Sequence, residues 1–100
     1  GRNQELALRV AEKLGDLPYN WVFMSAGTDG RDGPTEAAGG LVDGGTIGRL
    51  QEKGRSLSSF LDHSDSYNAL LLSDDLFITG STGTNVADVQ LFIRWPSYKG

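Results

Sequence analysis

The 100-residue sequence contains no cysteine, one methionine, one histidine and three prolines. The absence of cysteine fits a reducing compartment, and we expect a cytoplasmic protein. No apolar run approaches the roughly 20 residues of a membrane-spanning helix, and no signal peptide is visible at the polar amino end. Only nine Lys and Arg stand against 13 Asp and Glu, and they are scattered. A surface of this kind argues against nucleic acid as the partner, because phosphate binding needs concentrated positive charge.

The hydrophobic fraction of 38% is sufficient for one small globular domain. We expect that domain to span residues 1–95, with a tail at 96–100. The chain has no initiating Met and opens directly on a helix pattern, so we expect a piece of a longer protein, specifically its carboxyl-terminal domain.

Hydrophobic periodicity predicts an α/β fold. Residues 3–14 carry apolar side chains at helical spacing, with Asn3 expected as the N-cap and Gly15 as the stop. Residues 21–24 form an apolar run without polar alternation, which predicts a strand covered by helices on both faces, as in a parallel sheet. Residues 86–95 alternate, which is typical of an edge or one-sided strand. The remaining expected elements are helices at 46–53, at 56–62 and from Ser66, a strand at 76–78, and a strand or loop at 41–42. We therefore predict a small layered helix-sheet domain with a mostly parallel sheet.

The polar, glycine-rich run at residues 25–39 directly follows the first strand. Ligands of open α/β sheets gather beyond strand ends, and glycine allows the backbone to approach them closely. The spacing fits neither a calcium loop, nor a Walker-type phosphate loop, nor a dinucleotide fingerprint. Three interpretations remain open: an anion site built from backbone N–H groups and threonine hydroxyls, a magnesium site using Asp29 and Asp32, or two plain Asp-Gly turns.

A second loop of this kind, residues 80–85, follows the second strand. Its hydroxyls, amide and glycines fit an anion cradle or a plain turn equally well. Asp88 lies just beyond it, on the polar face of the last strand, where it could point toward the same crevice. At the other end of the chain, Arg2 places a cation at a helix start, which suits an anionic substrate but is also typical of an exposed arginine.

Three motifs together resemble the carboxyl-terminal MOFRL domain of glycerate 2-kinases, a family that older naming called hydroxypyruvate reductase. They are GRNQELAL at residues 1–8, GTDGRDGPTEAAG at 27–39 and TGSTGTNVAD at 79–88. The resemblance implies a two-domain enzyme with its active site in the cleft between the domains. It implies transfer of phosphate from ATP to the 2-hydroxyl of D-glycerate with Mg²⁺ or another divalent metal. Ala26 departs from the glycine that is frequent in the family.

The resemblance also implies roles for individual residues. The catalytic candidates are Arg2, Asp29 and Asp32, and the two aspartates are also the candidate metal ligands. Candidates for binding substrate or phosphate are Asn3, Gln4, Thr28, Gly30, Thr35, Thr82, Gly83, Thr84 and Asn85. The expected partners are the missing amino-terminal domain and D-glycerate, so we expect the isolated chain to be inactive. Two other functions stay open: a hydroxypyruvate reductase and a non-catalytic domain that binds a phosphorylated metabolite.

Overall fold

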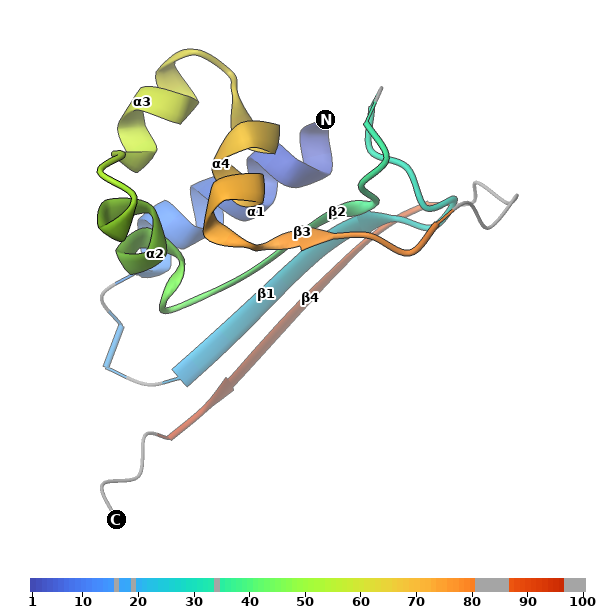
Figure 1. The fold of residues 1–100 in the computed structure, drawn as a ribbon. Coiled ribbons are helices and arrows are strands. Elements are labelled where there is room, and N and C mark those ends of the chain that lie inside the picture. Colours follow the sequence, from blue (N-terminus) through green and yellow to red (C-terminus); the bar gives the residue numbers. More distant parts are fainter. Residues whose placement is uncertain (16, 19, 34, 81–86, 97–100) are drawn as a thin grey trace.

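The computed structural model describes residues 1–15, 17–18, 20–33, 35–80 and 87–96. Within these residues, four helices lie on one face of a four-stranded sheet, giving two layers (Figure 1). The helices are α1 (Arg2–Leu14), α2 (Thr46–Glu52), α3 (Leu57–Asp62) and α4 (Ser66–Ser73). The strands are β1 (Asn20–Gly27), β2 (Gly39–Asp43), β3 (Leu76–Phe77) and β4 (Asp88–Trp95). The predicted positions of the helices and strands are confirmed to within a few residues.

The direction of the strands was predicted wrongly. The sheet order is β3-β2-β1-β4, and every neighbouring pair is antiparallel. A parallel pair needs a crossover that carries the chain back across the sheet, usually as a helix. The described residues between β1 and β2, 28–33 and 35–38, contain no helix, and β2 returns directly alongside β1. The expectation of helices on both faces is wrong for the same reason, whereas β4 is the edge strand that its alternation predicted.

The core lies between the helices and one face of the sheet. Leu8 of α1, Leu50 of α2 and Leu70 of α4 are fully buried against Trp21 and Phe23 of β1. Close packing depends on Gly40 of β2, because a Cβ atom there would lie 2.8 Å from the Ala7 Cβ and 2.9 Å from the Leu70 Cδ1. Among the described residues, no helix is both long and apolar enough to cross a membrane.

Candidate functional site

The two glycine-rich loops meet at one end of the sheet. Residues 28–33 leave the end of β1, and residues 78–80 leave the end of β3 (Figure 1). Gly30 has a φ of +83°, and a Cβ atom there would overlap the carbonyl oxygen of Gly80. The two loops are therefore in contact, which confirms that they open onto the same side of the molecule. The predicted site residues Thr82, Gly83, Thr84 and Asn85 lie outside the described residues.

A cavity of about 420 Å³ lies beside this contact. Three segments far apart in the sequence form its walls: the start of α1, the loop after β1 and the start of β4. Its lining residues are Arg2, Asn3, Asp29, Arg31, Asp32, Gly33 and Asp88. The structure thus brings together four of the predicted site residues, and it confirms that Asp88 points toward the same place.

Hydrogen bonds link the start of α1 to the start of β4. The Asn3 Nδ2 donates to the Asp88 Oδ1 over 3.0 Å, and its Oδ1 accepts from the Ser25 Oγ over 2.6 Å. The Arg2 guanidinium pairs with the other Asp88 oxygen at 2.6 Å. Asn3 is buried, whereas the Arg2 side chain is 81% exposed. A rigid amide therefore fixes the Asp88 carboxylate, and this carboxylate holds one edge of a guanidinium that otherwise faces solvent.

Asp32 holds the start of α1. Its Oδ1 accepts from the Asn3 backbone N–H over 3.0 Å and its Oδ2 from the Gln4 backbone N–H over 2.7 Å. The first N–H groups of a helix have no partner within the helix, and a carboxylate placed there also interacts favourably with the helix dipole. The prediction of Asn3 as the N-cap is therefore wrong: Gly1 occupies that position, and Asp32 supplies the acceptors from 28 and 29 residues away.

Gln4 and Thr35 support the loop and do not line the cavity. Gln4 is fully buried, and its Nε2 donates to the Thr35 Oγ1 over 2.8 Å. The Thr35 hydroxyl in turn donates to the Asp32 carbonyl oxygen over 3.1 Å. We therefore interpret both side chains, which the resemblance suggested as binding groups, as supports for the turn that carries Asp32.

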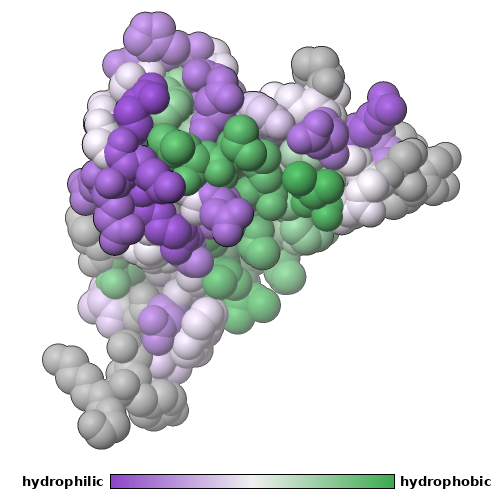
Figure 2. Space-filling model, viewed as in Figure 1, coloured by the Kyte–Doolittle hydropathy of each residue, from purple (hydrophilic) through white to green (hydrophobic). Residues whose placement is uncertain are grey.

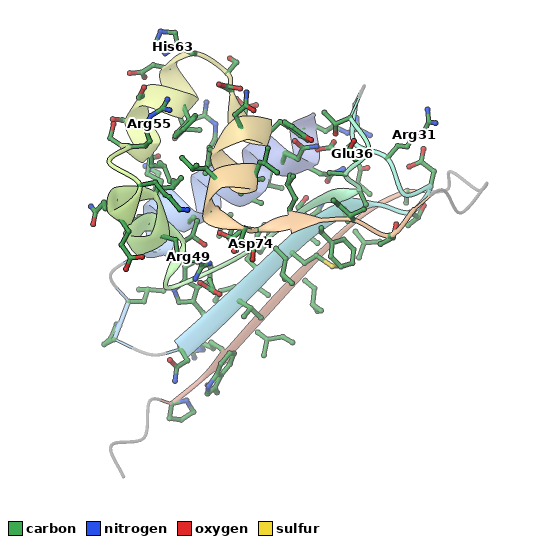
Figure 3. All side chains as sticks on the ribbon, viewed as in Figure 1. Arg31, Glu36, Arg49, Arg55, His63 and Asp74 are labelled. Atoms are coloured by element: carbon green, nitrogen blue, oxygen red, sulfur yellow. The ribbon has the colours of Figure 1, made fainter. Side chains whose placement is uncertain are left out.

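Asp29 and Thr28 occupy the first turn after β1. The Asp29 Oδ1 accepts the Arg31 backbone N–H over 3.0 Å, which is an Asx-turn. Thr28 joins the loop to the residue that precedes β4: its backbone N–H donates to the Ala87 carbonyl, and its Oγ1 accepts the Ala87 N–H over 3.1 Å. Arg31 projects away from the body of the domain (Figure 3). The turn thus presents Asp29 to the cavity, and Thr28 keeps the β4 end in place.

The charged residues that line the cavity are Arg2, Arg31, Asp29, Asp32 and Asp88, and of these the Arg31 side chain projects outward. Within the described part of the chain, no group of three or more His, Cys, Asp or Glu side chains could hold a metal ion. Mg²⁺ is commonly held by only one or two protein carboxylates, with the remaining oxygens coming from water and substrate phosphates. Asp29, whose carboxylate lines the cavity, is the side chain here that could serve as such a ligand, since Asn3 and Arg2 engage both oxygens of Asp88.

Sequence reasoning missed two residues that matter here, Ser25 and Arg31. Ser25 is fully buried and orients the amide of Asn3. The sequence could have indicated this role, because alternation places Ser25 on the same face of the strand as Trp21 and Phe23. A buried polar side chain at that position needs a hydrogen-bond partner from the helical layer. Arg31 was passed over as part of the turn.

Comparison with known proteins shows which family and which solved structures this chain is similar to. Residues 1–88 match the model of the MOFRL family. A D-glycerate 2-kinase of Thermotoga maritima is 54% identical over 89 residues, which cover 89% of this chain and 21% of that protein. A rat glycerate kinase is 44% identical over 96% of this chain and 20% of its own length. The crystal structure of a T. maritima glycerate kinase superposes with a TM-score of 0.89 at 52% identity, covering 93% of this chain and 22% of that one. The chain thus spans about a fifth of the length of these relatives.

Proposed function

Because this chain belongs to the MOFRL family, we propose that it forms the carboxyl-terminal domain of a glycerate 2-kinase. In this proposal it contributes to ATP-dependent phosphorylation of the 2-hydroxyl of D-glycerate. The observation that carries the proposal is the convergence of Arg2, Asn3, Asp29 and Asp88 on one cavity beside the two glycine-rich loops. The rest of the active site would come from the amino-terminal part of the longer polypeptide.

Phosphoryl transfer depends mainly on positioning and on neutralising the charge of the transferring group. We assign the neutralising cation to Arg2, which would bind the transferring phosphate or the glycerate carboxylate. Its ion pair with Asp88 uses one of the five N–H donors of a guanidinium, so an incoming anion can bind the others. The Asn3 amide keeps Asp88 and hence Arg2 oriented before substrate arrives.

We assign Asp29 to Mg²⁺ or to the 2-hydroxyl proton, because one of its oxygens is engaged in the Asx-turn and the carboxylate lines the cavity. A divalent ion bound with ATP would neutralise phosphate charge during transfer. We replace the metal or base role that the sequence suggested for Asp32 with a positioning role, because both of its oxygens accept backbone N–H groups of α1. Thr28, Gly30 and the 82–85 loop remain proposed contacts for phosphate or substrate oxygens.

The test compares Arg2→Ala with Arg9→Ala in the full-length protein. Both residues are exposed arginines of α1, but Arg9 pairs with Glu5 and lies outside the cavity. We expect Arg2→Ala to lower kcat/KM for ADP formation with D-glycerate by about tenfold or more, roughly 1.4 kcal/mol of barrier. Arg9→Ala should keep wild-type activity.

A loss below about tenfold in Arg2→Ala would remove the assigned role. The same enzyme should oxidise no NADH with hydroxypyruvate. Turnover in that assay without ADP formation would favour the reductase instead.

A further inference from the structure

The sheet has a second face, turned away from the helices, and it is apolar. In an antiparallel sheet, directly paired residues lie on the same face. Met24 of β1 pairs with Leu41 of β2 on one side and with Leu91 of β4 on the other, and none of the three belongs to the core cluster beneath the helices. We call this surface the open face and define it by Met24, Leu41, Val89, Leu91, Ile93 and Trp95.

The open face is large for a surface exposed to water. Five of its six side chains, all except Met24, are 41–50% exposed. Together they present roughly 400 Å² of accessible surface, comparable to the largest apolar patch on a typical monomer. Figure 2 shows hydrophobic side chains at the surface of the sheet, on the side away from the helices. None of these six residues carries a charge. The register also places Asp43 on this side, at the end of β2, where its carboxylate pairs with Arg49.

The residue pattern distinguishes this face from a solvated one. An antiparallel sheet with one wet face alternates apolar and polar residues, with the polar residues in water. In β4 the alternation is largely reversed: the apolar residues Val89, Leu91 and Ile93 face away from the helices, while Asp88 and Gln90 pair with Gly27 and Ser25 on the helix side. Phe92 is the exception, because it pairs with Phe23 and stacks on Trp21 on the helix side. This pattern is typical of a strand whose open face packs against other apolar side chains.

We propose that the amino-terminal part of the longer polypeptide packs on the open face. This inference rests on the proposed function, in which the chain is one domain of a larger kinase. About four-fifths of each relative lies outside the matched region, so a covalently attached partner is available. Attachment gives an effective concentration in the millimolar range for short flexible linkers, which favours an intramolecular neighbour over a second copy of the chain. Asp88 of the cavity and Val89 of the open face lie on opposite faces of β4, which is the last strand in the sheet order, so a body on the open face would contact both by reaching around this edge.

The experiment measures how fast a maleimide labels single cysteines in the full-length protein, without ATP, metal or glycerate. The 100 residues contain no cysteine, and any cysteine elsewhere is replaced by serine. Leu91→Cys reports on the open face. Val89→Cys is the second probe, in case the larger truncation at Leu91 disturbs folding. Ser58→Cys is the control, because Ser58 is an exposed residue of α3 in the helical layer and the substitution is nearly isosteric.

We expect both open-face cysteines to react at least about tenfold more slowly than the Ser58 probe, because a packed neighbour must open before reagent reaches them. A smaller difference overturns the inference. Protection that disappears on roughly hundredfold dilution also overturns it, because it identifies a second copy as the neighbour. The readout needs no catalysis, so protected cysteines in an inactive protein would contradict the proposed function and leave this inference standing.

Discussion

Substitution of Asp32 by Asn separates a positioning role from a metal role. Asn keeps one oxygen acceptor, but it turns an NH₂ group toward the second of the two backbone N–H groups and removes the charge at the start of α1. Bonds to a charged group contribute about 1.5–3 kcal/mol each, and a carboxylate at a helix start adds about 0.3–2 kcal/mol. Since Asp32 is only 3% exposed, water cannot replace the lost acceptor. We expect the first turn of α1 to be destabilised by about 2–3 kcal/mol.

The assay is hydrogen exchange of the peptide that covers the first turn of α1, in the full-length protein without metal or nucleotide. A loss of this size corresponds to roughly 30- to 150-fold faster exchange of the Asn3 and Gln4 amides. Asp29→Asn is the matched control, because it makes the same chemical change at a partly exposed carboxylate that, among the described residues, accepts the local Arg31 N–H and no N–H group of α1. We expect this control to change exchange in α1 by less than about threefold.

The opposite result would refute the assignment. If Asp32→Asn left exchange in α1 unchanged and instead abolished Mg²⁺ dependence, the carboxylate would act on the metal. In that case the two hydrogen bonds to α1 would contribute nothing measurable to the stability of the helix start.

Two further substitutions test the support around the site and the core. Gly30→Ala should destabilise the domain by about 1–3 kcal/mol and lower kcat/KM, because Gly30 has φ +83° and its Cβ would overlap the Gly80 carbonyl. Thermal unfolding measures this. Gly48→Ala in α2, where a Cβ meets nothing within 4 Å, is the control, and it should stabilise the domain by up to about 1 kcal/mol because Ala favours a helix over Gly. Arg49→Met should lower the free energy of unfolding by about 2 kcal/mol, because the guanidinium donates to the Asp75 Oδ1 over 2.6 Å. Breaking a fully buried pair costs roughly 3–5 kcal/mol, and the 37% exposure of the Arg49 side chain reduces this value. Burial raises the pKa of the Asp75 carboxyl, and loss of Arg49 raises it further, so the native state binds this proton more tightly than the unfolded state. The variant's free energy of unfolding in urea should therefore recover, relative to wild type, as the pH falls from about 7 toward 4, and the added Asp75→Asn should remove that recovery.

The helices could be predicted because their signals are local. In α1, apolar residues recur at helical spacing, so that Ala7, Leu8 and Ala11 are buried along one stripe. The meeting of the two loops was expected from a parallel sheet. It occurs in the antiparallel one because β1 and β3 both pair antiparallel with β2, and therefore run in the same direction and end on the same side. The hydrogen bonds of Asp32 to α1 were not predictable, because they join residues 28 and 29 positions apart and depend on how the loop after β1 folds back.

The error in strand direction has a physical cause that also clarifies the open face. The run at residues 21–24 lacks polar alternation, and this was interpreted as a parallel strand between two helical layers. Polar alternation indicates only which faces of a strand are exposed to water, whereas the direction of a strand depends on its connections. The described residues of the connection from β1 to β2 contain no helix. Trp21 and Phe23 are dry because the helices cover them. Val22 and Met24 are also apolar, but they lie on the face turned away from the helices. The absence of polar residues from the run at 21–24 is therefore what we would expect if a further part of the polypeptide packed on that face.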